Sequence, residues 1–399
     1  MQTPPERKMH RTSARLRLFA ASFVILTFAA VLGAAAFFKF YEPDPNENTY
    51  DPFGNLGPEE SMPGVILPNY DDGVSDSSNS FFDGLTQPKG RYNFLVVGLD
   101  KVSRSPDIMM IVSYDVKSGQ INIVQIPRDT YLKVDGIRGA YRINSYYSVY
   151  YNYANRNGHD DPETRALTNL AALIQKSFAI RLNYCAVVDL EGFVNIIDAV
   201  GGVDMDIPED MFYEDPYQDL YIDLKAGYQH LDGNRAMQFV RYRKGYAEQD
   251  IGRQNALKNF MSALLAQLKA NMNVGTMVNI SGEVMSNMRS NISTASFLYF
   301  AKSALSVDLS RVYMTTLPGR ATMVDGASVY VLYRDDTVAM INKYLNVFDR
   351  ELTREHFDPG SYMVGPGVEE IYESPLGTMS GDEYNAEDLN ENPIDIPRR

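Results

Sequence analysis

The alternation of apolar and polar positions is most regular between residues 92 and 131. Three apolar runs in this stretch are rich in β-branched and aromatic residues and have the length of strands, over residues 92–99, 109–114 and 121–126. Residues 116–120 contain a Ser-Gly pair typical of a turn, and they predict that the second and third strands form a hairpin. The polar segments around each run set the limits of the predicted strands.

The rest of the domain alternates helical and strand patterns. Apolar residues at helical spacing predict helices over residues 162–178, 191–200, 233–242, 250–269, 294–305 and 335–348. Shorter apolar or alternating runs predict strands over residues 184–189, 203–207, 221–224, 312–317 and 328–332. Asp232, and either Ser293 or Thr294, stand where the N-terminal caps of two helices belong. Because strands and helices interleave throughout, the sequence predicts one layered α/β domain.

A run without charged residues lies near the N-terminus. Residues 18–38 are apolar apart from Ser22, Thr27 and Gly33, and the run is long enough to span a bilayer as a transmembrane helix. Five basic residues before it predict that residues 1–17 form a cytoplasmic tail and that the chain beyond the span lies outside the cell. A cleaved signal peptide is the alternative, and the length of the run favours an uncleaved anchor.

Composition divides the rest of the chain. Residues 39–90 are rich in Pro, Asn, Asp, Gly and Ser and predict a flexible stalk, residues 91–350 form the predicted folded domain, and residues 351–399 an acidic, disordered tail. The net charge of −14 argues against non-specific nucleic-acid binding, so any anionic ligand must be held by a local group of arginines. Cys185, the single cysteine, stands in an apolar run and is expected to be a buried strand residue.

Charged residues gather at the ends of the first three predicted strands. Asp100 ends the first strand, Arg104 and Asp107 precede the second, and Arg128 and Asp129 follow the third. Carboxylate oxygens suit a divalent cation, and guanidiniums bind phosphate oxygens through two hydrogen bonds, so this group suits a metal-bound phosphate. A surface ion-pair network would gather the same residue types. The residues alone leave both interpretations open.

More arginines stand near the start of the helix expected over residues 250–269. Arg241 and Arg243 flank one residue and would point the same way in an extended segment, forming a two-pronged phosphate clamp. Arg253, in the first turn of the helix, would lie near backbone N–H groups that also favour anions. A solvated basic loop is the alternative. The sequence contains no Walker, HExxH, GxSxG or CxxC pattern, so the candidate chemistry rests on Arg and Asp.

Taken in order, the motifs of the chain resemble the LytR–CpsA–Psr family of bacterial cell-envelope proteins. They are FLVVGLD, SRSPDIMM, INIVQIPRDTY, RINSYY, VVDLEGFVNIIDAVGGVDMDIPEDM, YIDLKAGYQHLDGNRAMQFVRYR, DIGR and LPGRATMVDGASVYVL. The resemblance implies a single α/β/α sandwich domain with a central mixed sheet. It also implies an enzyme of the cell membrane, a phosphotransferase that moves an anionic glycopolymer, of teichoic acid or capsular polysaccharide type, from a polyprenyl-pyrophosphate carrier onto peptidoglycan.

The resemblance further implies roles for the charged residues. Asp100 and Asp107 would hold Mg²⁺ against the pyrophosphate, and Asp129 would orient Arg128, which makes Arg128, Asp107 and Asp129 the expected catalytic residues. The pyrophosphate oxygens would be bound by Arg104, Arg128, Arg142, Arg241, Arg243 and Arg253. The loop between Asp100 and Asp107 is short for the family and contains Pro106, which puts the position of Arg104 in question.

Two other functions fit the same residues. A pyrophosphatase acting on polyprenyl-pyrophosphate carriers would use the same site and would release phosphate without an acceptor. A non-catalytic, membrane-anchored lipid-binding or regulatory protein would bind the carrier and transfer nothing. Phosphoryl transfer depends on charge neutralisation and alignment, which Mg²⁺ and several guanidiniums supply, so these residues fit the transferase. An assay without a sugar acceptor would separate it from the pyrophosphatase.

Overall fold

The computed structural model describes residues 41–45, 85–100, 104–134, 137, 141–216, 220–247, 249–354, 368–372 and 383–396. The chain divides into two units, residues 1–43 and 44–399, and the second contains the sheet. The expected cytoplasmic tail and transmembrane helix lie outside the described residues, as does most of the expected stalk. Among the residues that are described, no helix has the length and apolar character needed to cross a bilayer.

A seven-stranded mixed sheet forms the centre of the second unit. Its strand order is β13-β10-β3-β2-β1-β4-β9, with β1 at Arg91–Asp100, β2 at Ser105–Asp115, β3 at Gln120–Gln125, β4 at Tyr184–Asp189, β9 at Arg289–Ser290, β10 at Val312–Thr316 and β13 at Tyr384–Asn385. β2 pairs antiparallel with both β1 and β3, which confirms the predicted hairpin. β1 pairs parallel with β4, and β3 with β10. The C-terminal ends of β1, β3, β4 and β10 therefore share one edge of the sheet.

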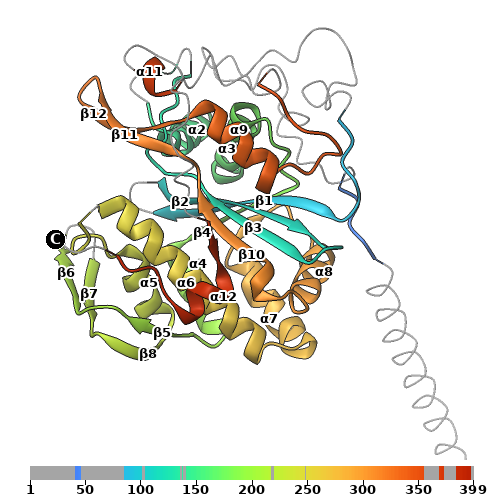
Figure 1. Ribbon diagram of the computed structural model, residues 1–399, viewed down its shortest axis with the longest axis vertical. Helices are drawn as coiled ribbons and strands as arrows, with labels where there is room; N and C mark the ends of the chain where they lie inside the picture. Colours follow the sequence, from blue (N-terminus) through green and yellow to red (C-terminus); the bar gives the residue numbers. More distant parts are fainter. Residues whose placement is uncertain are drawn as a thin grey trace, which may run out of the picture. The chain divides into compact units, whose positions relative to one another are not determined.

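Helices cover both faces of this sheet, as Figure 1 shows. On one face lie α2 (Ile143–Arg156), α3 (Pro162–Phe178) and α9 (Arg334–Tyr344); on the other lie α4 (Leu190–Ala199), α5 (Gly233–Arg241), α6 (Gln249–Asn271), α7 (Val274–Ser286), α8 (Thr294–Ala304) and α12 (Ala386–Glu391). Each face has its own apolar core, because side chains alternate along a strand. In β1, Leu95 and Val97 face the α2–α3 side, whereas Phe94 and Val96 pack against the other core. The structure confirms a mixed α/β fold with a central mixed sheet.

Three two-stranded sheets complete the fold. They are antiparallel pairs of β5 (Val203–Ile207) with β8 (Gly227–Leu231), β6 (Met211–Asp215) with β7 (Leu220–Leu224), and β11 (Gly319–Val324) with β12 (Ala327–Leu332). Two short helices are η4 (Leu309–Arg311) and α11 (Glu369–Tyr372). Thr130, after β3, forms an isolated parallel bridge with Tyr330. This bridge brings β12 to the edge of the main sheet at which β3 ends.

Helix starts agree with the caps that the sequence predicts. The side chain of Asp232 accepts a hydrogen bond from the backbone N–H of Arg235 at 2.8 Å, and α5 begins at the next residue. Ser293 caps α8 in the same way, through the N–H of Ser296 at 3.1 Å. α3 begins with Pro162 at its first position, where the missing N–H costs no hydrogen bond. Local capping chemistry thus determines where these helices begin.

The helix α2 is not among the predicted elements. Its buried apolar positions recur at helical spacing and are Ile143, Tyr146, Tyr147, Tyr150 and Ala154. Three of the five are tyrosines, whose hydroxyl groups make the apolar stripe hard to recognise in the sequence. The rings nevertheless fill the core between α2 and the sheet, as large aromatic side chains commonly do.

The acidic C-terminal segment is partly folded, so the prediction of a disordered tail over residues 351–399 is wrong for residues 383–396. β13 pairs with β10 at the sheet edge, and the buried Ala386 and Leu389 of α12 belong to the core that contains α6. Asn259 of α6 donates to the carbonyl of Ile394 at 3.1 Å and accepts from its N–H at 2.9 Å. A few apolar residues at the right spacing and one paired amide are enough to dock this segment despite its charge.

The last residues of the predicted stalk belong to the folded unit. Leu85 packs against the core on the α2–α3 side, and Gln87 is 3% exposed. The Gln87 amide donates to the carbonyl of Arg91 at 2.7 Å and to Oδ1 of Asn183 at 3.2 Å. These hydrogen bonds hold the segment beside the start of β1, so the domain begins several residues before position 91.

Leu389→Ala in α12 should lower the free energy of unfolding by about 2–4 kcal/mol, because the truncated side chain leaves a cavity in the core. Equilibrium unfolding of the full chain in urea would measure the difference. Asn390→Ala, at an exposed position of the same helix, is the matched control and should change the free energy by less than about 0.5 kcal/mol. Equal stability of the two variants would show that the C-terminal segment does not dock.

Candidate functional site

Asp107 occupies an irregular position in the pairing of β1 and β2. Gly98 pairs with Ile108 and Leu99 with Pro106, so Asp107 is the additional residue of a β-bulge. Bulges bend a strand and redirect the extra side chain, and they are frequent beside functional sites. A Cβ on Gly98 would stand 3.1 Å from the Cβ of Ile108, so the absence of a side chain there lets the two strands approach closely. The bulge lies at the sheet edge where β1, β3 and β4 end.

A turn after β3 brings Arg128 and Asp129 to the same edge. Pro127 has no N–H with which to continue the ladder of β3. β12 holds the turn from one side, since the N–H of Tyr330 donates to the carbonyl of Asp129 at 2.8 Å. The start of α2 holds it from the other, since the N–H of Asn144 donates to the carbonyl of Arg128 at 3.3 Å. The turn is therefore fixed by segments that are distant from it in the sequence.

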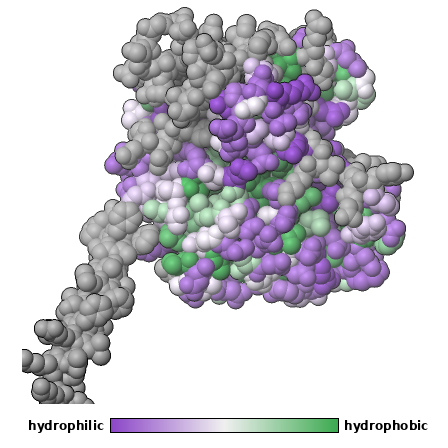
Figure 2. Space-filling model, turned by 180° about the vertical axis from the view of Figure 1, so that it is seen from behind, coloured by the Kyte–Doolittle hydropathy of each residue, from purple (hydrophilic) through white to green (hydrophobic). Residues whose placement is uncertain are grey.

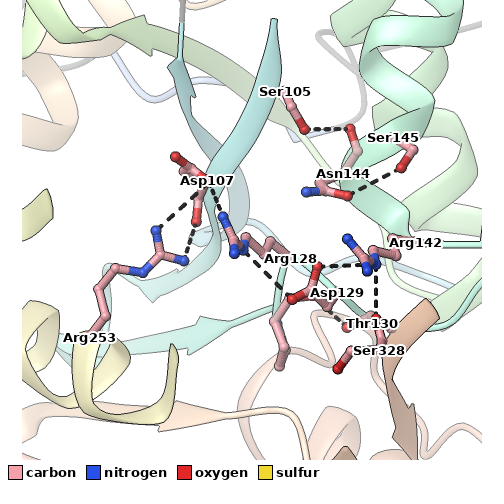
Figure 3. A network of polar contacts seen from close by, with 11 residues as sticks. Ser105, Asp107, Arg128, Asp129, Thr130, Arg142, Asn144, Ser145, Arg253 and Ser328 are labelled. Carbon is pink, nitrogen blue, oxygen red and sulfur yellow. Dashed lines mark hydrogen bonds and ion pairs between the residues drawn. The ribbon is translucent and has the colours of Figure 1, made fainter. Parts of the chain in front are cut away.

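The carboxylate of Asp107 lies between two guanidiniums, as Figure 3 shows. Nη1 of Arg128 donates to Oδ1 of Asp107 at 2.6 Å, and Nη1 of Arg253 stands 3.8 Å from the same oxygen. Nη2 of Arg253 also donates to the backbone carbonyl of Asp107 at 3.3 Å. These contacts join β2, the turn after β3 and the first turns of α6.

Close packing at the start of α6 places Arg253. A Cβ on Gly252 would stand 2.5 Å from the Cβ of Tyr246, a distance that no real side chain tolerates. Tyr246 is itself buried, so it has no room to move aside. The glycine therefore lets the first turn of α6 lie against Tyr246, and the next residue reaches Asp107.

A second carboxylate extends the network along the edge. Oδ2 of Asp129 lies 3.7 Å from Nε of Arg128, and Oδ1 of Asp129 lies 3.5 Å from Nε of Arg142. Nε of Arg142 also donates to the carbonyl of Ser328 in β12 at 2.9 Å. Negative and positive side chains thus alternate from Asp107 to Arg142, a sequence of contacts that can be followed in Figure 3.

The pKa of the Asp107 carboxyl lies below its usual value of 3.8. Burial by itself would raise the pKa, but the charges of Arg253, Arg128 and Arg243 and the hydrogen bond from Arg128 together outweigh burial. Asp107 is therefore a carboxylate at neutral pH and a poor proton acceptor. Its chemistry is that of an anchor for guanidiniums or a ligand for a cation.

The two arginines at the C-terminal end of α5, Arg241 and Arg243, have different surroundings. Arg243 lies near enough to Asp107 for its charge to lower the carboxyl pKa. Arg241 is the last residue of α5, and its guanidinium contacts the sulfur of Met237, one helical turn earlier, at 3.9 Å. Helical side chains are directed toward the N-terminus of their helix, which explains the orientation of Arg241. Among the described residues, Arg243 alone of the two joins the Asp107 group.

Arg104 points away from Asp107, contrary to expectation. Its guanidinium stacks over the ring of Tyr151 at 4.0 Å and pairs with Glu163 at 3.5 Å. Its backbone φ is +50°, and the hydroxyl of Ser148 donates to its carbonyl at 2.5 Å. This left-handed conformation, just before the bulge, directs the side chain toward α2 and α3.

Two of the predicted carboxylates stand at the bulge. Asp100 ends β1 and pairs with Ser105, which stands two residues before Asp107 in β2. In the part of the chain that the structure describes, no group of three or more His, Cys, Asp or Glu side chains is arranged to hold a metal ion. Mg²⁺ is commonly bound by one or two carboxylates, with substrate phosphates and water completing its shell. The donors at the bulge therefore suit Mg²⁺ together with a phosphate ligand.

An apolar cavity of about 270 Å³ lies between the sheet and the helices of its second face. Side chains of α4, α6, α7 and α8 line it, with Ile121 and Val312 from the starts of β3 and β10. Arg253 and the cavity residue Leu265 are separated along α6 by about 18 Å, at a rise of about 1.5 Å per residue. The charged group and the cavity thus lie toward opposite ends of α6. Figure 2 shows apolar residues gathered across the middle of the face opposite to that of Figure 1.

Several contributors to the site carry no signal in the sequence. Ser328 and Tyr330 act through backbone atoms, which any residue type could supply. Tyr151 and Glu163, which hold Arg104, belong to α2 and α3 and to none of the motifs with clustered charges. Their role follows from the packing of those helices beside the end of β1.

The fold and the site define an α/β protein with a group of arginines and carboxylates at the C-terminal edge of parallel strands, where such folds commonly bind ligands. The chain belongs to the LytR_cpsA_psr family, whose family model matches residues 69–346.

Curated relatives are about a quarter identical to this chain over the residues that align with it. TagV of Bacillus subtilis, a polyisoprenyl-teichoic acid–peptidoglycan teichoic acid transferase, is 25% identical over 225 residues, which cover 54% of each chain. TagU of Bacillus mycoides, which bears the same description, is 26% identical over 203 residues, 50% of this chain and 60% of TagU. The regulatory protein MsrR of Staphylococcus aureus is 27% identical over 217 residues, 53% and 59% of the two chains. The chain thus matches between half and two thirds of the length of these relatives.

Solved structures share the fold. The crystal structure of TagV from Bacillus subtilis superposes with a TM-score of 0.51 and 22% identity, over 68% of this chain and 98% of that one. A protein from Streptococcus agalactiae gives a TM-score of 0.52 and 19% identity, over 63% and 86% of the two chains. At these identities the likeness establishes the architecture of the domain.

Arg253→Met should raise the pKa of Asp107, because it removes a positive charge while the carboxyl stays partly buried. A carbon-13 NMR titration of the carboxyl would measure the change. Arg241→Met removes an arginine outside the group and should leave this pKa unchanged. An equal pKa in the Arg253→Met and unaltered chains would contradict the assigned cause.

The lowered pKa of the Asp107 carboxyl also makes the stability of the fold depend on pH. Because the folded-state pKa of Asp107 is lower than the unfolded-state value near 3.8, ionised Asp107 adds stability at pH above that value. This contribution is lost as the pH falls through the folded-state pKa. Arg253→Met should therefore weaken the dependence of the unfolding free energy on pH in this acidic range.

Proposed function

We propose that the chain is a phosphotransferase that moves an anionic glycopolymer, of teichoic acid or capsular polysaccharide type, from a polyprenyl-pyrophosphate carrier onto peptidoglycan. The observation that carries the proposal is the convergence of Arg128, Arg253 and Arg243 on Asp107 at the sheet edge. Membership of the family and the descriptions of TagU and TagV as teichoic acid transferases point the same way.

In this proposal the guanidiniums of Arg128, Arg243 and Arg253 bind the pyrophosphate oxygens. The acceptor hydroxyl oxygen bonds to the glycan-bearing phosphorus while the bridging P–O bond breaks, and polyprenyl phosphate leaves. The proton of the acceptor hydroxyl passes to solvent. Several planar guanidiniums suit the charge that collects on the leaving phosphate. Asp129, 3.7 Å from Nε of Arg128, keeps that guanidinium aligned.

A divalent cation belongs to the same proposal. Asp100 and Asp107 would hold Mg²⁺ together with substrate phosphate oxygens, where it would neutralise phosphate charge and polarise the phosphorus. The low pKa of Asp107 supports this role, since a metal ligand must be deprotonated.

The apolar cavity provides a place for the lipid. Its wall is almost entirely aliphatic and aromatic, and its volume of about 270 Å³ suits a segment of a prenyl chain that runs along α6 from the charged group. Such a carrier resides in a membrane, so we also propose that residues 18–38 anchor the chain there and that the domain lies on the outer face.

Arg128→Ala should lower the rate of transfer by about 10²–10³, the usual effect of removing one donor that stabilises developing charge. The full-length chain in detergent would be incubated with a synthetic polyprenyl-pyrophosphate glycan and peptidoglycan oligomers, with and without Mg²⁺. Mass spectrometry would detect the phosphodiester-linked product. Arg320→Ala, which removes an exposed arginine of β11, is the matched control and should retain full activity.

The outcomes of this assay separate the candidate functions. Full activity of Arg128→Ala would place the chemistry elsewhere. Release of phosphate without an acceptor would identify a pyrophosphatase, and binding of the carrier without any product would identify a non-catalytic binding protein.

Ala301→Phe should fill part of the apolar cavity, which Ala301 lines. The dissociation constant for a long prenyl pyrophosphate should rise at least about tenfold, equivalent to about 1.4 kcal/mol, while that for inorganic pyrophosphate stays unchanged. Isothermal titration calorimetry would measure both. Lys302→Ala, at the adjacent exposed position, is the control. An equal loss for both ligands, or none for either, would remove the cavity from the lipid site.

A further inference from the structure

A second hollow, a cleft of about 700 Å³, opens at the sheet edge where the parallel strands β1 and β4 end. Leu99 and Val187 form part of its floor, and residues from the starts of α3 and α4 and from the segment between α7 and β9 form its sides. The volume lies within the range of pockets that bind small ligands. The C-terminal ends of parallel strands are also the usual binding edge of an α/β sheet.

Charges of both signs line the cleft. Arg104 pairs with Oε1 of Glu163 at 3.5 Å, and Arg289 pairs with Oε2 of the same carboxylate. The end of β4 and the start of α4 add Asp189 and Glu191. Two guanidiniums and three carboxylates therefore face one polar space.

The ion pairs in the cleft are open to exchange. The side chains of Arg104 and Arg289 are 41% and 51% exposed, and ion pairs at such positions contribute at most about 1 kcal/mol. Nη1 of Arg289 also pairs with Asp161 at 3.2 Å, so a ligand carboxylate that displaces Glu163 would share this guanidinium with Asp161. Arg104 is held in place on its other side by the ring of Tyr151 at 4.0 Å.

The cleft and the Asp107 group flank the same irregular pair of strands. Leu99, on the floor of the cleft, pairs with Pro106, the residue before Asp107. Arg104 and Asp107 are separated by two residues of β2, and the turn of the backbone at Arg104 directs its side chain into the cleft. A ligand in the cleft would thus lie along the same edge of the sheet as a phosphate held at Asp107.

The balance of charges selects the ligand. A polyanion such as a teichoic acid or a second pyrophosphate would meet three carboxylates with two guanidiniums. An amino-sugar chain that carries a peptide presents hydroxyl and amide groups together with both carboxylates and an ammonium group. Such a ligand can pair with the lining residues of either sign.

We propose that this cleft binds the acceptor, a peptide-bearing amino-sugar strand of peptidoglycan, with Arg289 contacting a carboxylate of its peptide. The proposal rests on the proposed transferase function and assigns to its second substrate a site on the opposite side of the bulge from the arginine group. Arg104, expected at the pyrophosphate, belongs to the acceptor side instead.

The test uses the full-length chain in detergent and a soluble disaccharide–peptide fragment of peptidoglycan. Arg289→Ala should raise the dissociation constant of the fragment about tenfold and the KM for acceptor in the transfer assay by a similar factor. The affinity for a prenyl pyrophosphate and the kcat should remain those of the unaltered chain. Arg320→Ala serves as the exposed-arginine control, and Arg289→Lys should restore part of the affinity by keeping the charge.

The outcomes test acceptor binding in the cleft separately from the proposed transfer reaction. Fragment binding that depends on Arg289, with no product formed, would support the cleft and contradict the transfer reaction. Product formation with an unchanged acceptor KM in Arg289→Ala would support transfer and overturn the cleft. Loss of prenyl pyrophosphate binding in Arg289→Ala would also overturn it, because the residue would then belong to the donor site.

Discussion

The attraction between the Asp107 carboxylate and the surrounding guanidiniums is the interaction on which the site depends. Arg253 is 8% exposed, and a buried charge that loses its partner costs about 3–5 kcal/mol. The position of α6, the turn after β3 and the segment after α5 therefore all have to be compatible with one carboxylate. That carboxylate is in place because the bulge in β2 turns it out of the regular ladder. A local irregularity of two strands thus determines where three distant segments meet.

Charge neutralisation within the group explains how an acidic chain can hold several arginines close together. Four guanidiniums, those of Arg128, Arg142, Arg243 and Arg253, are interleaved with the carboxylates of Asp107 and Asp129. The carboxylates keep the arginines from repelling one another and fix their directions, yet they leave a positive excess. Because the chain as a whole carries a charge of −14, the polyanion of the proposed function would be attracted at short range by this group and not by the overall field.

Sequence patterns predicted the parts of the structure that depend on local physics. The strands between residues 91 and 125 and the helix α3 follow from the period of buried positions, and the start of α5 follows from the predicted cap Asp232. The patterns were less informative where residue chemistry is ambiguous, as for the tyrosines of α2, or where composition outweighs a short apolar motif, as for α12. The grouping of Asp107, Arg128 and Arg253 was expected from the family resemblance, because the residues alone left a surface ion-pair network and a solvated basic loop as alternatives.

Side-chain direction at irregular backbone could not be predicted. Arg104 and Asp107 are close in sequence, and the charged run to which both belong predicts a single site. The positive φ at Arg104 and the bulge at Asp107 send the two side chains to different partners, Glu163 on α3 and Arg128 after β3. This separation divides the edge of the sheet into two sides with different charge balance. In the proposed transfer reaction, the two substrates would approach the reacting bond from these two sides of the irregular strand.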